Sequence, residues 1–452
     1  MSFMRNKKEQ DAQNKEQISE EKKVKKQRTD GDIGPLAKAI FYIERLRELT
    51  PIQKVISKER TMVKARCGSD TGYADYALKT RLIRKLLVVV LVIAVLLGVI
   101  FSAGRLDIDN VYYSAMDIWY MNSYSESSTS TLNYTKAPIS EDFALYKNGL
   151  VAASGSEVKI FNATGRVTLT SGDIFATPTI VTSNKYVLVY DLGGNKFSIY
   201  NSFKNIWTVT LDGSIAYASM SEGGGFAVVE KTQDYNSVVH IYDDDCNRVS
   251  TYSTNQYVIS AEMSQSGRYT AVVSASAKNG EMTSKLTVLK QNKKKTYAQI
   301  DIGNLSPYTC KFISDNRIAV FCSDRVCVYN LKGKLKGEYM YPDSRLSYIS
   351  YADGGLSLLF EDDLINGKNT LIVLNKNGKS IYSGQMSGSF TDMEMYDNYV
   401  FLLTNNGIYK FNYKTKITTI KKSADTFGEL LVCSKDKVLL CTDSRGIYFD
   451  ME

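Results

Sequence analysis

A short run of oxygen-bearing side chains has part of the pattern of a calcium-binding loop. Asp243, Asp245 and Asn247 occupy the first, third and fifth positions of that pattern. Arg248 then stands where the loop needs glycine, and Thr254 stands where it needs a bidentate glutamate. A solvated turn is therefore the better interpretation, and we predict no metal site.

A second candidate group is the acidic run Glu361 to Asp363, which supplies the residue type used in general acid–base catalysis. It lies in the segment EDDLINGKN between two strand-like stretches, which favours a solvated turn. The chain has one histidine, His240, in the alternating stretch VVHIYD that is typical of a packed strand. A single imidazole leaves few routes to Ser-His or Cys-His catalysis. We predict no catalytic residue and no bound cofactor.

The seven cysteines do not form a CxxC motif or a Cys/His cluster with zinc spacing. Cys310, Cys322 and Cys327 lie close together in the sequence. A two-residue turn at Asp324 and Arg325 would place Cys322 opposite Cys327, within the reach of a disulfide. Buried free thiols are the alternative, and the sequence leaves both open.

A repeated short strand, usually ending in Asn or Asp, surrounds these candidates and extends from VKIFN at 158 to GIYFD at 446. The final residues of the eight copies are Asn162, Asn201, Asp243, Lys290, Asn330, Asn375, Asn412 and Asp450. The intervals of 39, 42, 47, 40, 45, 37 and 38 residues average about 41. A period of roughly 40–45 residues in strand-forming sequence is typical of a β-propeller.

Each repeat also contains two apolar strands before the repeated strand, as in FISDNRIAVFCS, and a Thr/Tyr-rich strand after it. Four antiparallel strands per repeat make one propeller blade. The repeated strands are apolar on both faces, which a blade packed between two neighbours requires. We therefore predict an all-β fold, a β-propeller of eight four-stranded blades, with seven as the alternative. Helical solenoids are excluded by the β-branched and aromatic runs.

The eighth repeat lacks an outermost strand, because the sequence ends at Glu452 directly after GIYFD and Met451. The segment 129–136, TSTLNYTK, has the composition of that strand and precedes the first repeat. We predict that it pairs with the last blade and closes the ring, which gives a propeller domain over 129–452.

Residues 86–103 read LLVVVLVIAVLLGVIFSA, without a charge, and are predicted to form a transmembrane helix. Lys79, Arg81, Arg84 and Lys85 precede it, so the positive-inside rule places the N-terminus in the cytoplasm and the propeller outside the cell membrane. Before it we expect a disordered arm at 1–34 and a basic juxtamembrane region at 35–85 with a short amphipathic helix. A stalk or linker at 104–128 follows.

Charge is distributed unevenly between the two sides of this segment. Residues 1–85 contain 21 Lys/Arg against 12 Asp/Glu, which leaves 35 against 36 for the remainder. A basic arm beside an apolar segment favours the lipid bilayer as its partner, and we predict no nucleic-acid partner.

The repeats, with units such as VCVYNLKGK and LIVLNKNGK, resemble the quinoprotein-like and WD40-like propeller superfamily. With the arm and the single span, the layout also resembles an uncharacterised family of membrane-anchored propellers from Gram-positive anaerobic bacteria. That resemblance implies a topology and no established activity. Quinoprotein dehydrogenases add a calcium site and a Trp-rich motif, whereas this chain has only Trp119 and Trp207. A redox function is therefore disfavoured.

The first functional hypothesis is a binding or scaffolding module that recognises a protein partner or an envelope glycan on one propeller face. A second is an enzyme acting on envelope polysaccharide through carboxylates that converge at the central channel. A third is a structural subunit of a membrane complex. Convergence of carboxylates around one channel mouth would distinguish the second from the others.

Overall fold

The computed structural model describes residues 76, 80, 83–92, 131–134, 141–278, 280–293, 295–352, 354–363 and 365–451. Residues 83–92 are helical. In this described part of the chain no helix is both long and apolar enough to cross a membrane. The expected span at 86–103 is described only as far as Val92, and the predicted arm, most of the juxtamembrane region and the linker lie outside the described residues.

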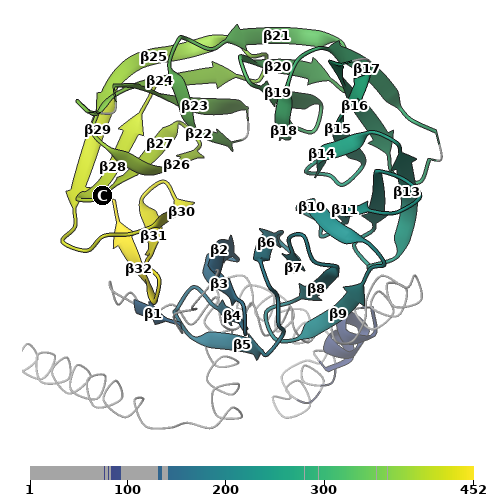
Figure 1. The fold of residues 1–452 in the computed structure, drawn as a ribbon. Coiled ribbons are helices and arrows are strands. Elements are labelled where there is room, and N and C mark those ends of the chain that lie inside the picture. The colour runs from purple at the N-terminus through teal and green to yellow at the C-terminus, as the bar shows by residue number, and fades with distance from the viewer. Residues whose placement is uncertain are drawn as a thin grey trace, which may run out of the picture. The chain divides into compact units, whose positions relative to one another are not determined.

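The described strands form a ring of eight four-stranded antiparallel sheets, so the prediction of eight four-stranded blades is confirmed (Figure 1). Blades 1 to 7 each take four consecutive strands, and blade 8 has the order β1-β32-β31-β30. The innermost strands, which surround the ring axis, are β2 (Glu141–Tyr146), β6 (Pro178–Thr182), β10 (Ser214–Met220), β14 (Tyr257–Met263), β18 (Pro307–Ser314), β22 (Arg345–Ala352), β26 (Phe390–Tyr396) and β30 (Glu429–Ser434).

The two middle strands of every blade are the most buried. The second strands are β3 (Gly149–Ser154), β7 (Val187–Asp191), β11 (Phe226–Lys231), β15 (Tyr269–Lys278), β19 (Arg317–Cys322), β23 (Gly355–Asp363), β27 (Tyr399–Thr404) and β31 (Lys437–Cys441). The third strands, which carry the sequence repeat, are β4 (Val158–Phe161), β8 (Lys196–Tyr200), β12 (Ser237–Tyr242), β16 (Glu281–Lys290), β20 (Arg325–Asn330), β24 (Lys368–Asn375), β28 (Gly407–Asn412) and β32 (Arg445–Asp450).

Most residues of the outermost strands are exposed or half-buried, and β29 is fully exposed, whereas Leu132 of β1 and Ile302 of β17 are buried. They are β5 (Val167–Ser171), β9 (Asn205–Thr210), β13 (Arg248–Thr254), β17 (Ala298–Gly303), β21 (Leu335–Met340), β25 (Ser380–Ser387), β29 (Ile417–Lys422) and, for blade 8, β1 (Thr131–Asn133). The face that carries the connections from each outermost strand to the next innermost strand is called the upper face below.

The Asn that ends most repeated strands caps the turn into the outermost strand. At Asn330 the side-chain Oδ1 accepts hydrogen bonds from the amides of Lys332 (3.1 Å) and Lys334 (2.8 Å). Gly333 completes this turn with φ 79°, a conformation that glycine adopts without strain. Asn375 makes the same pair of contacts in blade 6. The sequence repeat thus reflects a repeated turn.

Hydrophobic clusters lie between neighbouring blades rather than in one central core. One cluster joins blades 5 and 6 through buried residues such as Phe321, Val328 and Phe360. Another joins blades 8 and 1 through Leu132 and Leu150, both fully buried. Each blade therefore buries both of its faces, as the two-sided apolar pattern of the repeated strands requires.

The ring closes through β1. Thr131 pairs with Ile447, Leu132 with Gly446 and Asn133 with Arg445, all antiparallel. The observed strand lies inside the segment 129–136 for which pairing was predicted. The Tyr134 hydroxyl extends this contact by donating to the carbonyl of Thr442 at 2.6 Å.

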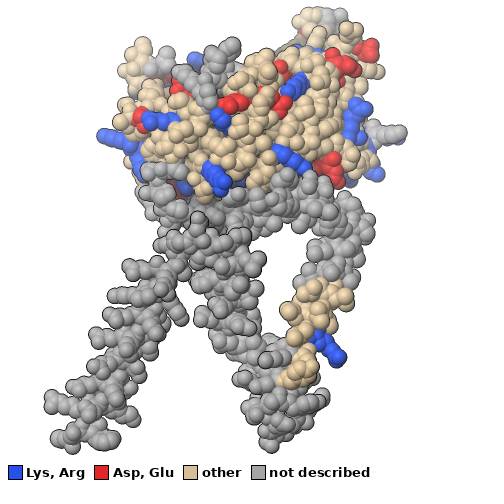
Figure 2. All heavy atoms as spheres, turned by 90° about the horizontal axis from the view of Figure 1, so that it is seen from below, with Lys and Arg blue, Asp and Glu red and all other residues tan. Residues whose placement is uncertain are grey.

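The rim visible in Figure 2 carries Lys/Arg and Asp/Glu side chains scattered among uncharged residues. On the part of this face that is coloured, charges of one sign do not merge into a continuous patch.

Candidate functional site

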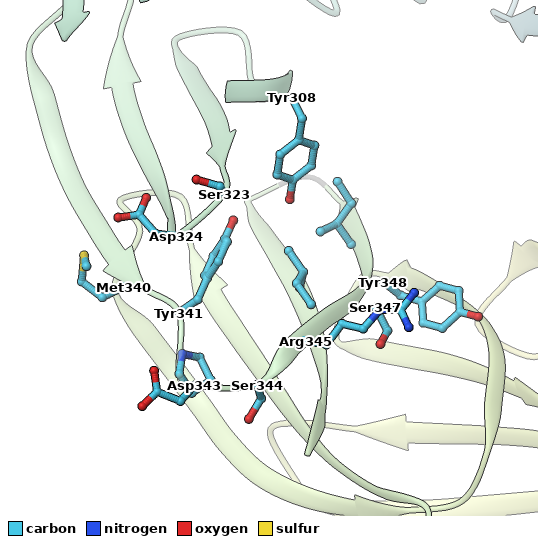
Figure 3. Close-up of a pocket in the computed structure, with 13 residues that line it drawn as sticks. Tyr308, Ser323, Asp324, Met340, Tyr341, Asp343, Ser344, Arg345, Ser347 and Tyr348 are labelled. Carbon is cyan, nitrogen blue, oxygen red and sulfur yellow. The ribbon is translucent and has the colours of Figure 1, made fainter. Parts of the chain in front are cut away.

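A cavity of about 700 Å³ opens on the upper face between blades 5 and 6. It is formed by the end of β21, the connection that follows it, the start of β22 and the β19–β20 turn, together with Tyr308 of β18 (Figure 3). Its lining includes Tyr308, Asp324, Met340, Tyr341, Asp343 and Arg345. A volume of this size lies in the range of about 300–1,000 Å³ found for ligand pockets.

Two tyrosines form the aromatic part of the lining. Tyr308 is 44% exposed, and its hydroxyl and that of Tyr341 point toward the same part of the cavity (Figure 3). The Tyr341 ring packs against Phe360 with ring centroids 5.3 Å apart. Burial, and next the neighbouring Tyr308 hydroxyl, raise the pKa of Tyr341. Burial also raises the pKa of Tyr308, so both hydroxyls are neutral at physiological pH. The hydroxyl oxygen of Tyr341 is buried, which leaves that of Tyr308 as the accessible one.

The wall of the cavity is fixed to both blades. The Tyr341 amide donates to the Asp324 carbonyl at 2.9 Å, which joins the connection to the blade 5 turn. The Ser344 hydroxyl donates to Asp362 at 2.7 Å, and Asp362 also accepts from the Thr370 hydroxyl at 2.6 Å, which joins the connection to blade 6. These contacts hold the cavity open in a defined shape.

Carboxylates outnumber cations around the cavity mouth. Arg325 is bound by Asp324 at 2.8 Å and lies 3.4 Å from Glu338. The Arg345 side chain is 81% exposed and lies 4.0 Å from Glu361. The charged residues in the upper parts of these two blades are the acids Asp324, Glu338, Asp343, Glu361, Asp362 and Asp363 and the cations Arg325, Arg345 and Lys368. This region therefore has an acidic excess.

A second polar site lies along the innermost strands, where blades 3 to 6 each contribute one residue. Lys311 of β18 donates to Glu262 of β14 at 3.0 Å and to the Tyr217 hydroxyl of β10 at 3.1 Å. Its ammonium lies 5.7 Å from the centre of the Tyr351 ring on β22. Burial acts to lower the pKa of Lys311, but the Glu262 charge together with Tyr351 and Tyr217 outweighs burial, and the pKa lies well above its ordinary value. This group links four blades through one cation.

The innermost strands of blades 7, 8 and 1 carry carboxylates instead. Three of them accept backbone amides from the innermost strand of the next blade: Asp142 from Ile180 at 2.6 Å, Asp392 from Leu430 at 2.8 Å and Glu394 from Val432 at 2.6 Å. These bonds attach neighbouring blades to one another. The fourth, Glu429 of β30, makes no side-chain hydrogen bond to a described residue.

These carboxyl groups influence one another electrostatically. Burial raises the pKa of Glu429 to about 8, and the carboxylates of Asp142, Asp392 and Glu394 add to the effect. Burial, partly offset by the Val432 amide, raises the pKa of Glu394 to about 8 as well. Four acids from three blades therefore converge, and two of them hold protons at neutral pH. Among the described residues, no group of three or more His, Cys, Asp or Glu side chains is arranged to hold a metal ion.

One residue of each acidic group identified from sequence organises a turn, although Glu361–Asp363 forms the end of β23 rather than the solvated turn that was expected. Asp243 Oδ1 accepts from the amides of Asp245 at 3.0 Å and Asn247 at 2.8 Å, as the Asn residues of other blades do. Asp363 accepts from the amides of Ile365 and Asn366 in the same manner. Neither group is brought together with the carboxylates of the innermost strands.

The predicted pairing of Cys322 with Cys327 is wrong. The β19–β20 turn lies at Ser323 and Asp324, one residue earlier than expected, so Val320 rather than Cys322 pairs with Cys327. Both cysteines are buried free thiols in one hydrophobic cluster with Cys310. Burial raises the pKa of Cys322 to about 12, which makes it unreactive.

His240 is buried, as its strand pattern indicates, but it also has a charged neighbour. Its Nε2 lies 2.7 Å from a carboxylate oxygen of Glu230, and Glu230 accepts the Gly213 amide at 2.6 Å through its other oxygen. His240 thus helps to fix the connection between blades 2 and 3 and lies apart from both candidate sites.

Sequence reasoning missed the residues of both sites. Asp142 and Glu429 belong to no motif, and their only signal is a charged residue inside a strand that is otherwise half-buried. The acidic residues at the cavity are distributed over segments from 324 to 363, of which only the run 361–363 stands out in the sequence. The residues of each site come close together only because the ring places their strands side by side.

Comparison with known proteins identifies a family but not an activity. A family model described as "Family of unknown function (DUF5711)" matches residues 120–447. No curated protein matches the chain. Among solved structures, the crystal structure of BamB from Moraxella catarrhalis is similar, with 13% identity and a TM-score of 0.48 over 71% of this chain and 96% of that chain. A similarity of this size says nothing about the function of this chain.

Proposed function

Because the chain belongs to the DUF5711 family, whose function is unknown, we propose from geometry that its propeller is a binding module for a protein partner. The observation that carries the proposal is the cavity of about 700 Å³ between blades 5 and 6. The partner inserts a side chain or a short segment there.

The composition and support of the cavity suit this role. Tyrosine, methionine and arginine are the residue types enriched at protein interfaces, and Tyr308, Met340 and Arg345 supply them here. Tyr308 and Met340 are 44% and 51% exposed, so both present apolar surface to a partner. Because the wall is bonded to both blades, little ordering entropy opposes binding.

Photo-crosslinking tests this function. A benzophenone amino acid is introduced at Met340, and separately at Ile381 on the outermost strand of blade 6, which is 49% exposed and serves as the matched control. We expect a discrete crosslinked species from position 340 but not from position 381, and the additional substitution Tyr308→Ala should weaken it. Identical crosslinks from both positions would refute the proposal.

We also propose that the chain is anchored in the cell membrane by residues 86–103, with the propeller on the extracytoplasmic side. The uncharged segment and the basic residues before it support this topology. Single cysteines at Ser19 and Ser387, on a background without the seven native cysteines, provide the test. Labelling from outside the cell should reach position 387 only; labelling at position 19 alone would invert the topology.

A second candidate function is hydrolysis of envelope polysaccharide, and the convergence of Asp142, Asp392, Glu394 and Glu429 favours it. Glu429, whose pKa is raised to about 8, holds the proton that a general acid needs, with other carboxyl groups beside it. Three of these acids, however, are occupied in bonding adjacent blades. Release of reducing ends from envelope polysaccharide by the wild type but not by Glu429→Gln would establish the enzyme and displace the binding module as the leading function.

A further inference from the structure

The cavity between blades 5 and 6 also indicates what kind of side chain it receives. Tyr308 and Tyr341 supply aromatic rings to its lining, and Met340 adds a polarisable thioether (Figure 3). Aromatic faces attract cations as well as apolar groups, so the aromatic lining alone does not decide between them.

The charge around the mouth of the cavity favours a cationic occupant over an apolar one. Of the acids there, Asp343 lines the cavity, is exposed and has no ion pair with a described residue. Asp324 also lines it, and its carboxylate is shared with Arg325, which remains 26% exposed. With six carboxylates against three cations in the upper parts of the two blades, the electrostatic potential favours a positively charged occupant.

The propeller itself uses the same combination of groups for its own cations. Lys311 is held by Glu262 together with the Tyr217 and Tyr351 rings. Lys185 contacts Asp244 and lies 4.9 Å from the centre of the Tyr186 ring. A carboxylate beside a tyrosine is therefore a cation site that this fold builds repeatedly. At the cavity Asp324 already pairs with Arg325, whereas Asp343 has no ion pair with a described residue.

We propose that the cavity between blades 5 and 6 binds an arginine or lysine side chain of the partner protein, with Asp343 as the carboxylate that pairs with it. This inference rests on the proposed function, because it assumes that the cavity receives a protein segment. Tyr308, which is 44% exposed, provides the aromatic contact. Arg345, at the mouth, repels the occupant and limits its affinity.

Two substitutions of opposite expected sign test the inference. The full-length protein is applied to an array of octapeptides of randomised sequence, and the bound peptides are compared with those bound by Asp343→Asn, Arg345→Ala and the control Asp397→Asn, an exposed acid in the lower turn of blade 7. We expect enrichment of Arg and Lys, a loss of about three- to tenfold in affinity for Asp343→Asn, and a gain for Arg345→Ala. The control should bind as the wild type does.

The outcomes separate this inference from the proposed function. Binding of peptides that lack basic residues, abolished by Tyr308→Ala, would overturn the inference and leave the binding module intact. Unchanged binding by Asp343→Asn would also overturn it. Absence of peptide binding, together with binding to a glycan array, would overturn both.

Discussion

The Glu394 carboxylate accepts the backbone amide of Val432 at 2.6 Å, which bonds the innermost strand of blade 7 to that of blade 8. The same carboxyl group has a pKa of about 8. A contact that joins two blades therefore changes charge near neutral pH.

The first prediction follows from this property. In the unfolded chain Glu394 and Glu429 have pKa values near 4.3, whereas in the fold both are raised to about 8. The folded state binds more protons than the unfolded chain between these pH values. The stability that these two carboxyl groups contribute is therefore fully present below about pH 4 and is lost as the pH rises through 8. Thermal melting of Glu429→Gln should decline less between pH 5 and 9 than melting of the wild type. Parallel declines in the two proteins would contradict the raised pKa.

Lys311 supports four blades, so its removal should be costly. Lys311→Met leaves Glu262 without its cation, and because both side chains are partly exposed we expect a loss of about 2 kcal/mol of unfolding free energy. The double variant Lys311→Met/Glu262→Gln should recover part of this loss. Urea denaturation of the wild type, the single variant and the double variant measures the unfolding free energy of each. An equal loss of unfolding free energy in the two variants would argue against the ion pair.

The closing strand can be tested with two adjacent residues that face opposite sides. Leu132 is fully buried between blades 8 and 1, whereas Thr131 is exposed. Leu132→Asp should lower unfolding free energy by about 3 kcal/mol or more, and Thr131→Asp should change it little. Deletion of residues 128–137 should lower the melting temperature of the whole propeller. Unchanged melting after that deletion would show that β1 does not stabilise the ring.

The repeated asparagine gives a smaller expected effect. Asn375→Ala removes the acceptor for the Asn377 and Lys379 amides, and we expect a loss of about 1 kcal/mol. Lys376→Ala, in the same turn, should be neutral. Denaturation midpoints compare the two, and equal values would mean that the repeat is not maintained by the turn.

The fold was predictable because its local requirements recur along the chain. Asn162, Asn201 and Asn330 mark the same turn, and the strands before them are apolar on both faces, so eight blades can be counted from sequence. The register of the β19–β20 hairpin was harder to predict from sequence. A two-residue turn fits either Ser323–Asp324 or Asp324–Arg325, and only the packed hairpin selects the first. This register leaves Cys322 and Cys327 as buried free thiols, which is one of the two alternatives that the sequence left open.

The candidate sites were not predictable for a different reason. Asp142 and Glu429 are 287 residues apart (429 minus 142) and influence each other only because the ring closes. The cavity depends on where two blades place side chains that have no common pattern in sequence. A repeat predicts the scaffold, and departures from the repeat supply the chemistry.

The position of β1 also affects how the protein is made. This strand leaves the ribosome before any blade, yet its partner Ile447 is 316 residues later (447 minus 131). If blades 1 to 7 form during synthesis, the two faces that flank blade 8 stay exposed until its strands have been made. Contacts this distant in sequence slow folding and lengthen exposure to aggregation. We expect biosynthesis to depend on chaperones that shield those faces until the last hairpin has been synthesised.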